Sequence, residues 1–217
     1  MQTLTQHLIE CGLSNRVLTE KQLGRVLTGS DQRRYHLVNR ALKAGELHRL
    51  RRGAYLLDSR FRDHPPHPFA LAQAFVRGSY VTFETALAQH GWIPETVRTV
   101  ASVTPGSKSA RFEHDVFGSF SFHPLALHPG YFLELVERLQ MQQQTMLVAR
   151  PIRALMDLVC LRKVVWQGMG WIVDGLRIDY EILRCVTTAD MKTLGLIYKQ
   201  KRVQSFLTAF AKELGID

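Results

Sequence analysis

The chain has 217 residues, an apolar fraction of 46% and a net charge of +9 at pH 7. This composition suits a globular protein with a buried core and argues against disorder. The isoelectric point near 9.8 favours a polyanionic partner, nucleic acid first and an anionic membrane surface second. No apolar run approaches the roughly 20 residues that span a bilayer, and the first residues do not resemble a secretory signal. The three cysteines are odd in number and far apart, so we expect reduced thiols in a cytoplasmic protein.

Two short helices are expected before residue 28. Residues 3–12 place apolar side chains at helical spacing. Thr19 and Gln22 have the T-x-x-Q spacing of a capping box, which predicts a second helix from there to about Leu27.

Residues 28–57 predict a capped helix followed by a basic hairpin. Ser30 is a favourable N-cap after Gly29, and Gly45 lies where the helix would end. At 100° per residue, one face of this helix gathers apolar side chains, namely Tyr35, Leu37, Val38, Ala41 and Leu42. The strands ELHRL and AYLL follow, around a tight turn from which Arg51 and Arg52 are expected to project without partners.

This order of elements predicts a winged helix-turn-helix domain over residues 1–60. Its third helix would enter the major groove of DNA, and its hairpin would lie along the backbone or the minor groove. Residues 1–60 hold eleven Lys and Arg against five Asp and Glu, so most of the excess charge lies in about a quarter of the chain. The expected DNA-binding residues are Gln32, Arg33, His36, Arg40, Lys43, Arg49, Arg51 and Arg52. The structural alternative is a solvated basic helix beside an ordinary hairpin.

Residues 61–68 are the expected linker, because prolines and mixed charge replace any apolar periodicity. His64 and His67 have a spacing that a metal could use, but no second pair of ligands lies nearby, so no metal site is predicted.

Residues 69–217 predict an α+β domain, and the fold class of the whole chain is therefore α+β. A small antiparallel sheet of three strands is expected between residues 96 and 123. Helices are expected over residues 131–144, from Pro151 onward and in three segments after Asp179, while residues 166–175 receive no assignment.

Few residues of the chain have the types and the spacing that a catalytic site needs. Glu113 and Asp115 would share one face of a strand, but no D-x-K or E-x-K motif of a metal-dependent nuclease follows them. No phosphate-binding loop and no G-x-S-x-G motif is present. We therefore predict no enzyme, no catalytic residue and no cofactor. Three aromatic residues either stack on single-stranded bases or form core, with core favoured, namely Phe112, Phe120 and Phe122.

Three stretches of the second part carry a family resemblance. They are YVTFETALAQHGWIPETV from Tyr80, TVASVTPGSKSARFEHDVFGSFSFHPL from Thr99 and VARPIRALMDLVCL from Val148. In their order and spacing they resemble the AbiEi family, the antitoxin and transcriptional-regulator components of type IV toxin–antitoxin systems of abortive infection. Thr82 and Thr85 stand where small serines are usual in that family.

The resemblance implies two roles. The N-terminal winged domain would bind the operator upstream of its own operon and repress transcription. The C-terminal domain would counter a nucleotidyltransferase-like toxin, with which stable contact is not required. Two other classes stay open: a nucleic-acid-processing enzyme that a winged domain delivers to DNA, and a winged protein-interaction module whose basic helix face is incidental.

Overall fold

The computed structural model describes residues 3–141 and 144–216 as a mixed α+β protein. The chain divides into two compact units. Unit 1 holds the residues up to Arg77 and the described residues of the segment 140–145, and unit 2 holds Gly78–Leu139 and the residues from Met146 onward. In the described part of the chain, no helix combines the length and apolar character needed to cross a membrane.

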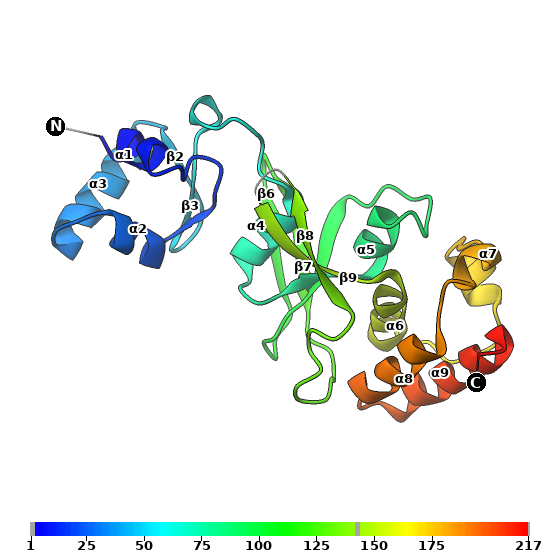
Figure 1. The fold of residues 1–217 in the computed structure, drawn as a ribbon. Coiled ribbons are helices and arrows are strands. Elements are labelled where there is room, and N and C mark those ends of the chain that lie inside the picture. The colour runs from blue at the N-terminus through cyan, green and yellow to red at the C-terminus, as the bar shows by residue number, and fades with distance from the viewer. Residues whose placement is uncertain (1–2, 142–143, 217) are drawn as a thin grey trace. The chain divides into compact units, whose positions relative to one another are not determined.

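Unit 1 consists of helices around a three-stranded antiparallel sheet (Figure 1). In chain order its first six elements are α1 (Leu4–Glu10), β1 (Leu18–Thr19), α2 (Glu20–Val26), α3 (Asp31–Lys43), β2 (Leu47–Arg51) and β3 (Ala54–Leu57). The strand order is β1-β3-β2. The predicted capping box at Thr19 and Gln22 is confirmed, because each side chain accepts a hydrogen bond from the other's backbone N–H.

Leucine side chains from α1, from α2 and the turn after it, and from the sheet form the core of unit 1, and Val38 and Ala41 add the buried face of α3. The assignment of Tyr35 to this face is wrong, because its side chain is 66% exposed. Tyr35 lies about a quarter of a turn around α3 from the midpoint of Val38 and Ala41, beyond the arc that the core covers. Leu37 and Leu42 are half-buried at the two edges of that arc.

The expected linker, residues 61–68, lies inside unit 1 and is held there. It follows the 3-10 turn η1 (Ser59–Phe61) and leads into α4 (Pro68–Phe75). Asn15 and Asp63 exchange two hydrogen bonds of 2.9 Å. His67 caps α4, because its Nδ1 accepts the Phe69 N–H at 3.2 Å.

Unit 2 is built on a six-stranded mixed sheet, larger than the antiparallel sheet predicted from the sequence. The strands are β4 (Tyr80–Val81), β5 (Thr99–Val103), β6 (Ala110–His114), β7 (Gly118–His123), β8 (Val136–Met141) and β9 (Gln144–Ala149), in the order β6-β7-β5-β4-β9-β8. The predicted hairpin of β6 and β7 is antiparallel, but β6 takes the edge, so β7 lies beside β5 and runs parallel to it. Strands β4 and β9 are also parallel.

The helix predicted over residues 131–144 is wrong where the structure describes it; residues 142–143 lie outside the described part. The segment forms turns and then β8. Leu135 takes a φ of 56°, which a right-handed helix cannot contain. The carbonyl of Glu134 accepts a hydrogen bond of 2.7 Å from the buried guanidinium of Arg153. The contact with Arg153 and the backbone conformation of Leu135 are both incompatible with the helix that the local pattern predicts.

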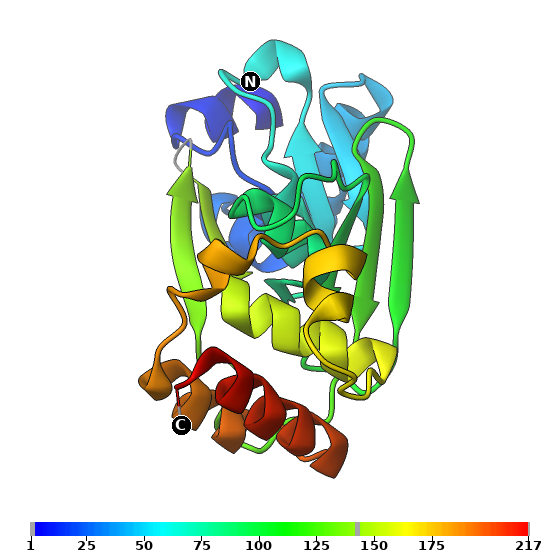
Figure 2. The same ribbon diagram turned by 90° about the vertical axis from the view of Figure 1, so that its right-hand side faces the viewer.

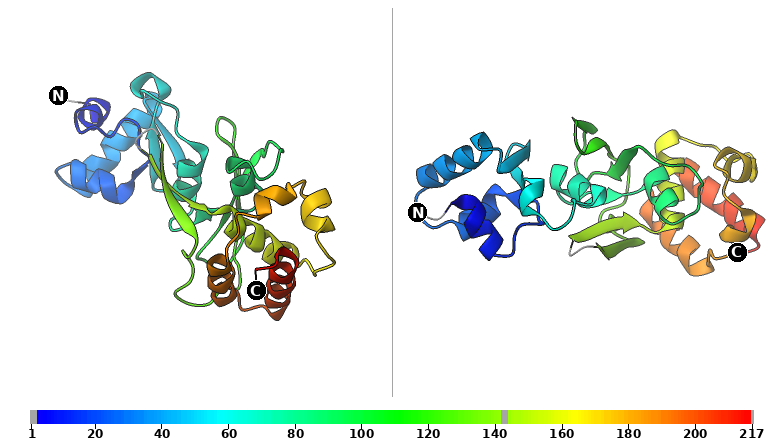
Figure 3. Two further views of the ribbon diagram at one scale, coloured as in Figure 1. Left: turned by 45° about the vertical axis from the view of Figure 1, so that its right-hand side comes forward. Right: turned by 90° about the horizontal axis from the view of Figure 1, so that it is seen from above.

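The helical segments of unit 2 are α5 (Phe83–Gln89), α6 (Pro151–Arg162), the π-helical turn η2 (Trp171–Gly175), α7 (Tyr180–Leu183), α8 (Thr188–Ile197) and α9 (Lys201–Leu214). Helices α5, α8 and α9 pack against α6. The predicted helix start at Pro151 is confirmed, and every residue of α6 from Ile152 to Cys160 is buried. Helices α8 and α9 lie side by side (Figure 2 and Figure 3). Residue Trp166, unassigned from the sequence, packs edge-on against Phe206 of α9.

Candidate nucleic-acid interface

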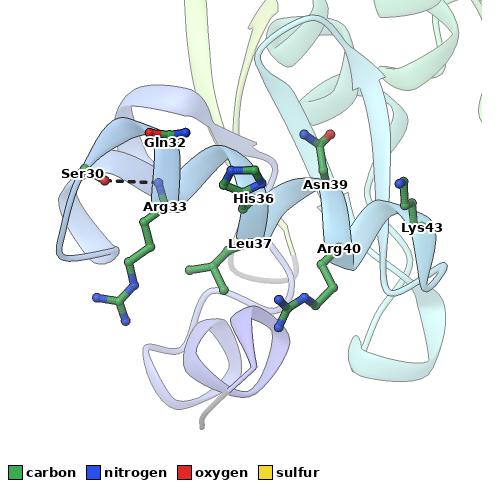
Figure 4. A pocket seen from close by; sticks show the side chains of 8 residues that line it. All are labelled: Ser30, Gln32, Arg33, His36, Leu37, Asn39, Arg40 and Lys43. Atoms are coloured by element: carbon green, nitrogen blue, oxygen red, sulfur yellow. Dashed lines mark hydrogen bonds between the residues drawn. The ribbon is translucent and has the colours of Figure 1, made fainter.

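The outer face of α3 gathers the predicted recognition residues into one open groove of about 770 Å³, which we call the α3 groove. Five of its lining residues were predicted from the sequence, and all five are exposed: Gln32, Arg33, His36, Arg40 and Lys43. Figure 4 shows their side chains along the helix, with Arg33 and Arg40 extending to the same side as Leu37. The helical spacing therefore predicted this grouping correctly.

Local capping and burial set the orientation of this face. The Ser30 hydroxyl accepts the Arg33 N–H at 3.3 Å and starts the helix. Burial of Val38 and Ala41 on the opposite side fixes the rotation of α3 about its axis. The stem of Arg33 lies against Gly29, where an added Cβ would come within 3.1 Å of Arg33 Cδ.

The charges of the α3 groove are not neutralised from within the described part of the chain. No acidic residue is among the residues that line the groove. The nearby carboxylate of Asp31 is paired with Arg34 at 2.5 Å instead. None of the charged groups of Arg33, Arg40 and Lys43 forms an ion pair with another described residue. Exposed cations of this kind add little to folding stability, but they attract a polyanion.

Asn39 is half-buried and also lines the α3 groove, although it was not predicted from the sequence. Its position three residues after His36 and seven after Gln32 was the available signal, because such residues share one helix face. An asparagine side chain offers both a donor and an acceptor, the pattern that pairs with an adenine edge.

The sheet adds Arg49 to the same surface. Arg49 is exposed on β2, and its guanidinium carbon lies 5.9 Å from the centroid of the Tyr55 ring. Together with Tyr35 and Asn39 it lines a small recess of about 110 Å³ between α3 and the sheet. The recess shares Asn39 with the α3 groove, and the carboxylates of Glu20 and Asp31 also line it.

The turn of the hairpin is hydrogen-bonded to α2 and α4, so the expectation that Arg51 projects freely is wrong. Arg51 is half-buried, and its Nε donates to the carbonyl of Ala74 in α4 at 2.9 Å. The Gly53 carbonyl accepts the Glu20 N–H at 3.1 Å, which ties the turn to the start of α2. A bulge between Arg49 and Arg51 shifts the strand register, and such bulges re-aim side chains.

Arg52 differs from Arg51. Its side chain is exposed, and it makes no hydrogen bond or ion pair to another residue that the structure describes. The turn therefore presents one unpartnered arginine, where the sequence predicts two.

The residues of the other candidate sites do not form a site in the described structure. Asp115 lies beyond the end of β6, and Glu113 pairs with Arg111 at 3.2 Å. Phe120 and Phe122 are fully buried core residues. Across residues 3–141 and 144–216, no three His, Cys, Asp or Glu side chains form a group that could hold a metal ion.

Unit 2 has a recess of its own, of about 530 Å³, beside α5 and α6. The two carboxylates that line it are each paired with an arginine, Glu84 with Arg162 and Glu95 with Arg177. The Arg177 contact holds the pKa of Glu95 below its usual range, so this carboxylate stays ionised and is poorly suited to act as a general acid.

Neither the models of known protein families nor the curated proteins contain a match to this chain.

Proposed function

We propose that unit 1 is a winged helix-turn-helix domain that binds double-stranded DNA with α3 in the major groove. The observation that carries this proposal is the α3 groove, in which unneutralised cations and hydrogen-bonding side chains share one exposed face with no acidic lining residue. The order of three helices followed by the β2–β3 hairpin supports it, because this is the order of elements in winged domains.

The groove suggests a division of labour along α3. Gln32, Arg33 and His36 belong to the first turns, from which recognition helices reach base edges. Arg40 and Lys43 lie further along and suit phosphate contacts, which position the protein without reading sequence. Of the hairpin residues, we assign a DNA contact to Arg49 and Arg52, and a structural role to Arg51.

The biological role that we propose is repression of the chain's own operon, together with an antitoxin activity against a nucleotidyltransferase-like toxin. The support for this role is the sequence resemblance to the AbiEi family in the stretches from Tyr80, Thr99 and Val148. The operator upstream of the operon would be the DNA partner, and unit 2 would carry the antitoxin activity.

The test compares binding of the full chain to its own upstream region and to random duplex DNA. Arg33→Ala should cost about 1–3 kcal/mol on the upstream region and much less on random DNA. Arg138→Ala is the matched control, because Arg138 is an exposed arginine of unit 2. An equal loss on both DNAs would show that Arg33 contacts only the backbone, and no loss on either would remove the α3 groove as the DNA site.

Antitoxin activity needs a separate assay, co-expression with the product of the neighbouring gene. If unit 2 carries the activity, Arg33→Ala should still relieve growth arrest. Failure of the unchanged chain to relieve any arrest would refute the antitoxin role and leave DNA binding untouched.

A further inference from the structure

A second basic surface lies in unit 1, in an open groove of about 500 Å³ between α2 and α4, which we call the α2–α4 groove. Four cationic side chains line it: Arg16, Lys21, Arg25 and Arg77. None of these residues belongs to the α3 groove.

The four cations come from three separate segments. Arg16 precedes β1, Lys21 and Arg25 lie one turn apart on α2, and Arg77 follows α4. All four are exposed, and none forms a side-chain hydrogen bond or an ion pair with another described residue. No acidic residue is among the described residues that line the groove. Like charges gathered in this way repel one another unless an anion lies between them.

Gln144 forms part of the wall of the groove. Its side chain lines the α2–α4 groove, and the residue is only 8% exposed. The Oε1 atom accepts the His67 N–H at 3.1 Å, but Nε2 is buried without a hydrogen-bond partner in the described structure. Nε2 has almost no accessible surface, so the exposed cations, and not this donor, are the groups that a ligand in the groove can reach.

A hydrogen bond to the hairpin fixes the wall of the groove that α4 forms. Arg51 Nε donates to the Ala74 carbonyl, and Ala74 itself lines the groove. The anchored arginine of the hairpin therefore holds one wall of the groove in place.

We propose that the α2–α4 groove binds phosphate groups of a nucleic-acid backbone through its four exposed cations. Four exposed cations without an acidic neighbour in the groove select a negatively charged ligand. Their spread over three segments matches a row of phosphates better than one small anion. The inference rests on the proposed DNA binding of unit 1, to which the groove adds sequence-independent affinity.

The test uses the full chain and a random duplex of about three helical turns at several salt concentrations. The groove variant is Lys21→Ala, Arg25→Ala and Arg77→Ala together. Each lost phosphate contact lowers the slope of log K against log salt by about 0.9, so the slope should fall by up to about 2.7. The loss of affinity should then be up to about 40-fold larger at 50 mM salt than at 200 mM salt.

The control variant removes the same charge from unit 2, through Lys192→Ala, Lys199→Ala and Lys201→Ala at three exposed positions. Its salt slope should stay close to that of the unchanged chain. Equal melting temperatures for all variants would establish that folding is intact.

The outcomes separate this inference from the proposed function. If Arg33→Ala weakens binding while the groove variant behaves like the control, the inference is wrong and DNA binding by α3 stands. If neither variant weakens binding, both the inference and the proposed DNA binding by α3 are wrong. If pyrophosphate alone raises the melting temperature of the unchanged chain but not of the groove variant, and both bind duplex equally, the groove holds free anions and the backbone assignment fails.

Discussion

The buried carboxylate of Asp157 should be the most sensitive single position in unit 2. Asp157 and Arg153 are both completely inaccessible to solvent and lie one turn apart on α6. The carboxylate accepts four hydrogen bonds, from Arg153 Nε at 2.9 Å, Tyr198 Oη at 2.8 Å, Thr82 Oγ1 at 2.8 Å and Tyr80 Oη at 3.0 Å. Burial, and then the charge of Asp157, raises the pKa of both tyrosines, so both stay protonated and donate.

Asp157→Asn should destabilise unit 2 by about 3–5 kcal/mol. The amide has no charge, so the buried guanidinium of Arg153 loses its counter-ion, and removing one partner of a buried pair costs this amount. At roughly 2–4 °C per kcal/mol, the melting temperature should fall by about 6–20 °C. Arg153→Met should cost a similar amount, because it leaves the carboxylate unpaired.

Scanning calorimetry and urea unfolding of the full chain measure both variants and the double variant Arg153→Met with Asp157→Asn. The double variant leaves neither charge buried alone, so its cost should be lower than the sum of the single costs by at least about 1 kcal/mol. The matched control is the exposed pair of Arg184 and Glu181, in which Glu181→Gln should leave the stability nearly unchanged. A cost of Asp157→Asn that is as small as that of the control, or strict additivity in the double variant, would contradict the assignment of a buried, mutually dependent ion pair.

Arg51→Ala should lower the stability of unit 1 by about 1–3 kcal/mol in urea unfolding, because it removes a half-buried charged donor from a carbonyl of α4. Arg52→Ala should leave stability unchanged and flatten the salt slope of DNA binding by about 0.9, and a reversal of these two phenotypes would contradict the assignment. Hydrogen bonds from Arg60, and then from His48, hold the pKa of Asp58 well below its usual range. The stabilisation from Asp58 is therefore complete above its unfolded pKa of about 3.9 and is lost as the pH falls toward the lower folded value. Asp58→Asn should lower the free energy of unfolding by about 1 kcal/mol at pH 7. When unfolding is measured from pH 7 downward, the difference between the unchanged chain and the variant should become smaller below about pH 4.

Features that depend on neighbours a few residues apart could be predicted from the amino-acid sequence. The capping box at Thr19, the N-cap at Ser30 and the helix start at Pro151 each depend on side chains within one turn of the helix end. The grouping of Arg33 and Arg40 in the α3 groove follows from the period of the helix, once its apolar side is buried.

Features that join distant segments of the chain could not be predicted from the sequence, because they depend on contacts that form only on folding. Arg51 is turned from a projecting residue into an anchor by a strand bulge and by α4, which lies 23 residues further along the chain. The pattern of residues 131–141 permits a helix locally, but Val136–Met141 pairs with β9 as the strand β8. Just before it, the buried guanidinium of Arg153 holds the Glu134 carbonyl, and Leu135 takes a positive φ. Local propensities differ by only about 1 kcal/mol per residue or less, so a few buried contacts between distant segments are enough to override them.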